Sequence, residues 1–116
     1  MKEFYRRYLQ RCNDHRFGEL GEFVAERVEI NGVPSDLGGY GAGLQSVIDS
    51  YPDFHWHLQQ VLVEGEWMSA RLVDTYTAGD GPRALQEFAF YRVSGGRIVQ
   101  VWGDLDRDRL EVAGPG

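Results

Sequence analysis

The segment from residue 88 to residue 106 constrains the fold more than any other part of this chain. An apolar, aromatic run over residues 88–93 is followed by Ser94-Gly95-Gly96 and then by a second β-prone run over residues 98–102. Glycines can adopt the positive φ angles that a two-residue hairpin turn requires. The segment therefore predicts two antiparallel strands joined by a tight turn, and the second strand leads into a glycine and two aspartates.

Two long alternating segments precede this hairpin. In residues 54–63 and 67–76, apolar and polar side chains alternate with the period of two that is typical of a strand with one buried face. A bulge is expected in the first segment at Gln59-Gln60. Turn-forming residues at 64–66 and 78–82 connect these strands to each other and to the hairpin, which predicts four long antiparallel strands in succession.

The N-terminal half has the spacing of helices instead. Residues 2–12, 17–23 and 44–51 place apolar side chains at helical intervals, so three helices are expected. A short strand is expected at residues 28–30, and the glycine-rich stretch 34–43 is predicted to be a loop. Helices and long strands are thus segregated along the chain, which indicates an α+β fold with a curved antiparallel sheet wrapped around three N-terminal helices.

Composition limits the class of protein. A chain of 116 residues has room for one domain, expected over residues 1–112, with a frayed tail at 113–116. The net charge of −6 disfavours nucleic acid and an anionic membrane as partners, and the apolar runs are too short to span a bilayer. Cys12 is the single cysteine, which rules out an internal disulfide and favours a cytoplasmic location.

Short motifs occur along almost the whole chain in a recognisable order and spacing. They are Tyr8 with Asn13-Asp14-His15, Tyr51-Pro52-Asp53-Phe54, Val63-Glu64-Gly65-Glu66, Ala70-Arg71, Tyr91-Arg92-Val93, Gly95-Gly96-Arg97-Ile98-Val99 and Trp102. In these motifs the chain resembles the SnoaL-like polyketide cyclases, within the nuclear transport factor 2-like superfamily that also contains ketosteroid isomerases. The resemblance implies a cone-like, cystatin-like roll with an internal pocket.

The chain departs from the family at one informative place. In the cyclases that it resembles, the last strand commonly carries a histidine, a tryptophan and then an aspartate that acts as general acid and base. Here these positions are Val101, Trp102 and Gly103. Two interpretations follow: the acid lies elsewhere in this chain, or the protein binds a ligand without that reaction.

Two aspartates are candidate catalytic acids. Asp74 continues the apolar face of Met68, Ala70 and Leu72, so a regular strand directs it towards the core or a cavity. A buried carboxylate costs several kcal/mol unless it is paired or hydrated. Asp74 is therefore either part of a paired network, with Glu87 on the next strand and Arg71 or Arg92 as compensation, or an acid/base in a pocket. Asp104 is the second candidate, provided that a bulge at Gly103 turns it inward.

A second group of side chains is predicted to bind the substrate. Asn31 and Tyr40 offer hydrogen bonds to a carbonyl or enolate oxygen, although Asn31 also suits a turn. The aromatic members suit a flat, apolar ligand. The predicted set is Asn31, Tyr40, Trp56, Tyr76, Phe88 and Trp102.

No metal site is predicted, because His55 and His57 flank Trp56 without an obvious third ligand. An open sheet face that carries Trp67 predicts a homodimer.

Two functions remain open from the sequence. The first is a cofactor-independent enzyme of the cyclase or isomerase type, in which Asp74 or Asp104 removes a proton next to the carbonyl of a small apolar or aromatic molecule. The second is a non-catalytic binding or assembly module with the same fold.

Overall fold

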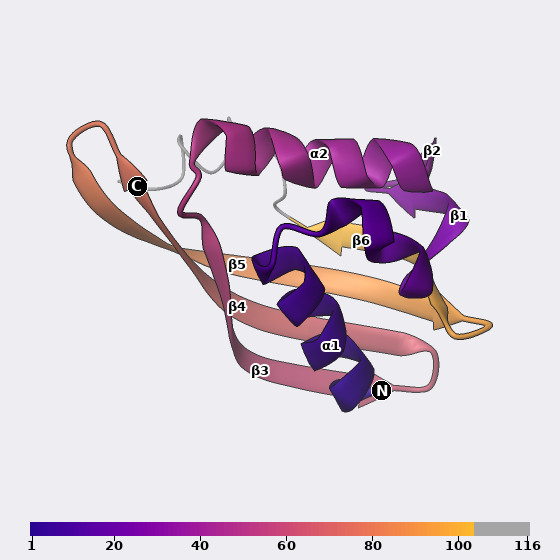
Figure 1. Cartoon of the computed structure of the whole chain (residues 1–116). Coiled ribbons are helices and arrows are strands. Elements are labelled where there is room, and N and C mark those ends of the chain that lie inside the picture. Colours follow the sequence, from indigo (N-terminus) through magenta and orange to yellow (C-terminus); the bar gives the residue numbers. More distant parts are fainter. Residues whose placement is uncertain (104–116) are drawn as a thin grey trace.

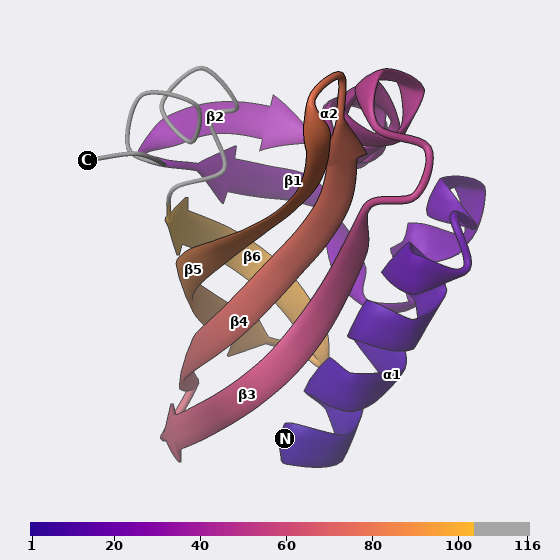
Figure 2. The same ribbon diagram turned by 90° about the vertical axis from the view of Figure 1, so that its left-hand side faces the viewer.

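The computed structural model describes residues 1–103, and its elements follow the predicted order of helices and then long strands. Both α-helices lie on the same side of a curved sheet (Figures 1 and 2), which confirms the predicted α+β fold. Within the described residues, no helix is both long and apolar enough to cross a bilayer. The elements are α1 (Lys2–Asn13), η1 (Phe17–Glu22), β1 (Val24–Ile30), β2 (Val33–Asp36), α2 (Leu37–Ser50), β3 (His55–Glu64), β4 (Trp67–Ala78), β5 (Gly81–Ser94) and β6 (Arg97–Gly103).

The sheet has six strands in the order β2-β1-β6-β5-β4-β3. Strands β3 to β6 form the predicted antiparallel succession, and the turn at Gly95 (φ 61°) and Gly96 (φ 79°) has the two positive φ angles expected of it. The register of β3 against β4 shifts between Leu58 and Gln60, which confirms the predicted bulge. Strand β1 pairs in parallel with β6, so the sheet is mixed and not purely antiparallel.

The predicted loop at residues 34–43 is wrong. This stretch forms most of β2 and the first half of α2. The side chain of Asp36 accepts a hydrogen bond from the backbone N–H of Gly39 at 2.7 Å and so caps the helix at its start. Tyr40, Gly41 and Ile48 are buried where α2 packs on the rest of the fold. Packing thus outweighs the low helix propensity of glycine.

The central strands have one buried and one exposed face. On β4, Met68, Ala70, Leu72 and Asp74 are buried, as the alternating pattern predicts. The inner face of β5 consists of Glu87, Ala89, Tyr91 and Val93. The opposite face of the sheet carries exposed aromatic side chains, which we call the outer aromatic patch: Trp67, Phe88, Phe90 and Trp102.

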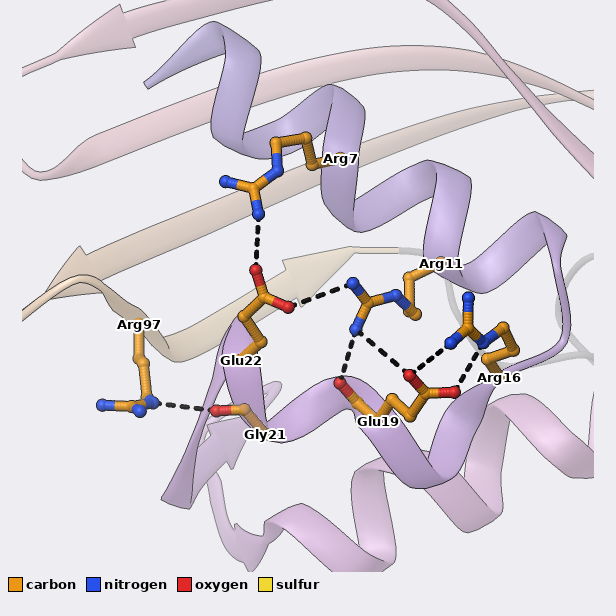
Figure 3. Close-up of polar contacts among 7 residues, drawn as sticks. All are labelled: Arg7, Arg11, Arg16, Glu19, Gly21, Glu22 and Arg97. Carbon is orange, nitrogen blue, oxygen red and sulfur yellow. Dashed lines mark hydrogen bonds and ion pairs between the residues drawn. The ribbon is translucent and has the colours of Figure 1, made fainter.

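Arginine and glutamate side chains join α1 to η1 (Figure 3). Arg7 and Arg11 both contact the Glu22 carboxylate, and Arg11 also donates to the carbonyl oxygen of Glu19 at 3.0 Å. Most of these groups are exposed, so each ion pair contributes little to stability. Arg11 is the exception, because its half-buried guanidinium also lies 5.0 Å from the centre of the Phe23 ring. The remaining contacts of this network are Arg11 with the Glu19 carboxylate at 4.0 Å, Arg16 with Glu19, and Arg97 with the carbonyl oxygen of Gly21.

The end of α1 is attached to β3, the edge strand of the sheet. The Asn13 side chain donates to the carbonyl oxygen of Trp56 and accepts from the Trp56 N–H, both at 2.9 Å. The amide thus satisfies the two backbone groups as a neighbouring strand would. The chain then turns at His15, whose φ is 58°.

Replacing Asn13 should therefore loosen the helix from the sheet. We expect Asn13→Ala to lower the free energy of unfolding by about 1–3 kcal/mol, because two partly buried backbone groups lose their partners. Asn13→Asp keeps the acceptor and loses the donor, so its effect should be smaller. Urea unfolding of the three proteins measures this difference, and equal stability of Asn13→Ala and the unchanged protein would contradict it.

Candidate active site

A small hollow lies between the helices and the inner face of the sheet, and we call it the inner hollow. Its volume is about 20 Å³, close to the minimum of about 10–15 Å³ that one water molecule needs. Residues from α1, α2, β3, β4 and β5 surround it, so the whole α+β arrangement contributes to it. The lining consists of Tyr5, Tyr8, Leu9, Cys12, Tyr40, Leu44, Trp56, Leu72, Glu87 and Tyr91.

Two carboxyl groups are buried at this place. Asp74 on β4 is 0% exposed, and Glu87 on β5 is 3% exposed. Asp74 lies opposite Leu85 and Glu87 lies opposite Leu72, so the two acids occupy diagonal positions on the inner face. The predicted inward direction of Asp74 thus agrees with its place in the structure. Glu87 is a lining residue of the inner hollow, whereas Asp74 is not.

The Asp74 carboxyl group is electrostatically unusual. Burial raises its pKa, while a hydrogen bond with Glu87 and the nearby His57 act in the opposite direction. With both acids ionised, neither oxygen of Asp74 has a hydrogen-bond donor among residues 1–103. Carboxylates only accept hydrogen bonds, so a bond between the two side chains requires one of them to hold a proton. The pair is therefore suited to sharing a proton.

The sequence left open whether Arg71 or Arg92 balances the charge of these acids. The structure places neither arginine in that role. Arg92 forms its ion pair with Glu66, at 3.2 Å. Arg71 lies between the inward-facing residues Ala70 and Leu72 and hence belongs to the outer face.

Tyrosine hydroxyl groups supply the polar surface of the inner hollow. Tyr5 and Tyr91 are hydrogen bonded through their hydroxyl oxygens at 3.1 Å, and Tyr8 and Tyr40 form a second, shorter pair. In each pair one hydroxyl group donates to the other, so the second hydrogen can be donated to another acceptor. The hollow therefore offers two hydroxyl donors close to a carboxyl group.

These hydroxyl groups stay protonated at neutral pH. Burial raises the pKa of Tyr5, Tyr8, Tyr40 and Tyr91, and the charge of Glu87 raises the pKa of Tyr5, Tyr40 and Tyr91 further. Burial also raises the pKa of Cys12 to about 12, so its thiol is a poor nucleophile. The lining thus provides donors and one acid, and no reactive sulfur.

The structure brings together three of the predicted site residues. Tyr40 and Trp56 line the inner hollow, and Asp74 is buried on the same inner face of the sheet, beyond the lining. Tyr76 lies apart from it, with its ring centre 4.4 Å from that of Tyr51. Asn31 has a φ of 51° in the turn after β1, and its side chain accepts from the Gly103 N–H at 2.9 Å, so it does not line the hollow.

The other predicted residues lie elsewhere. Phe88 is 57% exposed and Trp102 is 41% exposed, and both belong to the outer aromatic patch. Side chains of a strand point alternately to its two faces, and Glu87 and Ala89 lie on the inner face of β5. Phe88, between them, therefore lies on the outer face. Asp104 and the predicted tail at 113–116 lie outside the described residues. Within residues 1–103, no group of three side chains that could bind a metal ion lies at one place, and the surroundings of His55 and His57 are no exception.

Gly103 stands where the resemblance places the acid of the family, and its surroundings exclude a side chain. A Cβ atom there would lie 2.6 Å from the carbonyl oxygen of Phe88 and 3.2 Å from the Cα of Ala89. Both are backbone atoms of the paired strand β5, so they cannot move aside without shifting the sheet. This backbone geometry therefore leaves no room for an aspartate at position 103.

A helix-covered, curved α+β sheet with polar groups at its inner face defines the class of this protein as a cystatin-like, nuclear transport factor 2-like roll. The sequence matches the family described as SnoaL-like polyketide cyclase over residues 2–112. The chain belongs to the SnoaL-like polyketide cyclase family.

Solved structures agree with this assignment. A SnoaL-like polyketide cyclase from Agrobacterium tumefaciens is 32% identical, with a TM-score of 0.81 over 96% of this chain and 94% of that one. A loop-truncation variant of IdmH from Streptomyces antibioticus is 22% identical, with a TM-score of 0.84 over 99% and 98%. A cystatin-fold protein from Novosphingobium aromaticivorans is 16% identical, with a TM-score of 0.71 over 88% and 95%. No curated protein matches the sequence.

The buried Asp74 should cost the protein stability. Its raised pKa means that the folded state holds the proton more tightly than the unfolded chain, so stability falls as the pH rises from the unfolded value, about 3.9, through the folded one. We expect Asp74→Asn to raise the free energy of unfolding at pH 7 by about 1–3 kcal/mol. This gain should vanish below pH 4. Thermal unfolding at both pH values measures it, and a loss of stability at pH 7 would contradict it.

Proposed function

We propose that this protein is a cofactor-independent enzyme of the cyclase or isomerase type that moves a proton on an apolar, carbonyl-containing small molecule. The observation that carries the proposal is the buried pair Asp74 and Glu87 beside a hollow lined by tyrosine hydroxyl groups. Burial raises the pKa of Asp74, and acids whose pKa is shifted in this way concentrate at functional sites. The family of the chain supports a small organic substrate.

The chemistry uses groups that are already in place. A carboxylate of the pair removes a proton from a carbon next to a carbonyl group, and the C–H electron pair becomes the double bond of an enolate. Tyr40, whose hydroxyl group stays protonated, donates a hydrogen bond to the enolate oxygen. Trp56 forms an apolar wall against the reacting group. The substrate must open the inner hollow as it binds, because the present volume holds about one water molecule.

Parts of the predicted site remain proposals without support from this geometry. Asp104 is the alternative acid at the end of β6. The ligand roles of Asn31, Tyr76, Phe88 and Trp102 would require a binding mode that extends beyond the inner hollow. The cytoplasmic location rests on the single cysteine of the sequence.

A specific observation favours the second function, a binding module without catalysis. Gly103 replaces the acid expected from the resemblance, and the backbone of β5 closes that position to any side chain. In that case, the tyrosine hydroxyl groups and the carboxyl pair would serve to hold a ligand carbonyl.

Proton exchange distinguishes the two functions. We expect the protein to transfer deuterium from D₂O into a cyclic 1,3-diketone, followed by NMR, and the double variant Asp74→Asn/Glu87→Gln to be slower by at least about 100-fold. Glu3→Gln, an exposed carboxyl-to-amide change on α1, should match the unchanged protein. Loss of exchange in Asp104→Asn alone would assign the reaction to that acid. Binding of the diketone without exchange would establish the binding module.

We propose further that two copies of the chain associate through the outer aromatic patch. Leu62, Ser69, Phe90 and Trp102 are successive register partners across β3 to β6, which forms an exposed, mainly apolar row. Contiguous exposed apolar side chains are typical of interaction surfaces. The neighbouring Arg92 and Glu66 pair with each other within one chain, so the edge of the patch presents no unbalanced charge that would repel a second copy.

Light scattering tests the homodimer. We expect twice the mass of one chain for the unchanged protein and the mass of one chain for Phe90→Arg, because a charge in the centre of the patch opposes association. Ala42→Arg is the matched control, since Ala42 is exposed on α2, on the helix-covered side of the sheet and not on the face of the patch, and should leave the mass doubled. A single-chain mass for the unchanged protein would refute the dimer.

A further inference from the structure

The two acids of the buried pair are not placed alike. Glu87 lines the inner hollow together with Tyr5, Tyr40 and Tyr91, whereas Asp74 does not line it. Asp74 lies two residue pairs further along β4 and β5 than the Leu72–Glu87 pair, opposite Trp56 on one side and Leu85 on the other. A molecule in the hollow would therefore meet the carboxyl group of Glu87 and not that of Asp74.

The electrostatics agree with this placement. The charge of Glu87 acts on Tyr5, Tyr40 and Tyr91 and on the thiol of Cys12, which come from three different elements. The pKa of Asp74 is affected by burial, by Glu87 and by His57, and by none of these tyrosines. Glu87 is thus the acid that the hydroxyl groups of the hollow surround.

We propose that Glu87 is the carboxyl group that exchanges a proton with the substrate and that Asp74 is a positioning residue behind it. This inference rests on the proposed function and divides the roles within it. In the forward step, the Glu87 carboxylate takes the proton from the carbon next to the carbonyl group, and the enolate oxygen accepts a hydrogen bond from a tyrosine hydroxyl group. In the return step, Glu87 gives the proton back to a carbon of the enolate (isomerisation), or to the alkoxide oxygen that forms when the enolate carbon bonds to a second carbonyl carbon and the C=O electron pair moves to that oxygen (cyclisation). Neither route needs an oxidant or reductant.

Asp74 acts through Glu87. When Asp74 is ionised, its charge opposes ionisation of the neighbouring acid and so moves proton transfer towards neutral pH. When Glu87 holds the proton, Asp74 accepts its hydrogen bond and fixes its orientation. The titratable groups that face Glu87 from the packed elements are Tyr5, Tyr8 and Cys12 on α1, Tyr40 on α2, Asp74 on β4 and Tyr91 on β5.

Single variants separate the two roles in the diketone exchange assay. We expect Glu87→Gln to slow exchange by at least about 100-fold at every pH, and Glu87→Asp to recover part of the rate. Asp74→Asn should slow exchange by less than about tenfold and move the midpoint of the pH–rate profile to lower pH, because the like charge is removed. Glu3→Gln again serves as the control for an amide substitution.

The outcomes are distinct from those that test the function itself. Near-complete loss in Asp74→Asn with retained exchange in Glu87→Gln overturns this inference and leaves the proposed enzyme intact. An unmoved pH midpoint in Asp74→Asn overturns its positioning role. Absence of exchange in the unchanged protein overturns both the proposed function and this inference. Thermal unfolding of each variant shows whether a lost rate reflects a lost fold.

Discussion

A carboxyl group in a protein interior needs a donor, a cation or a proton, and both oxygens of Asp74 lack a hydrogen-bond partner among residues 1–103 when the two acids are ionised. The alternation of β4 and β5 fixes both acids on the inner face, so neither can turn to solvent without a change of register. Because the two carboxyl groups are close, one shared proton avoids two negative charges in the interior. The inner hollow thereby acquires a chemical character that the surrounding apolar core does not have.

The helices make this arrangement persist. Tyr5 and Tyr8 come from α1, and their hydroxyl groups meet Tyr91 on the sheet and Tyr40 on α2. Such a network has a defined geometry only if α1 keeps its place. The Asn13 amide ties the helix to the edge strand, while the arginine–glutamate contacts of Figure 3 tie it to η1. The exposed network is therefore relevant to the site even though each ion pair is weak.

Much of this arrangement follows from periodicity, and the exceptions have physical causes. The inward direction of Asp74 could be predicted because a strand alternates strictly, and the same rule places Phe88 outside once Glu87 is assigned to the inner face. The glycines of residues 34–43 favour a loop because glycine is a poor helix former, but the Asp36 cap and the burial of Tyr40 and Ile48 override that preference. The tyrosine pairs join residues far apart in sequence, which no local pattern reveals.

Under the proposed function, the acid of this chain lies at a different place from the one that the family resemblance predicts, because that position is Gly103. Removing a side chain at this position lets the backbone of β6 approach β5 more closely than any aspartate would allow. On the same strand β5, one residue before Phe88, Glu87 presents a carboxyl group to the interior. An acid on β5 can thus serve the hollow that an acid at the end of β6 would otherwise serve. Because a fold constrains the cavity more strongly than the residue that acts in it, this relocation requires no change in topology.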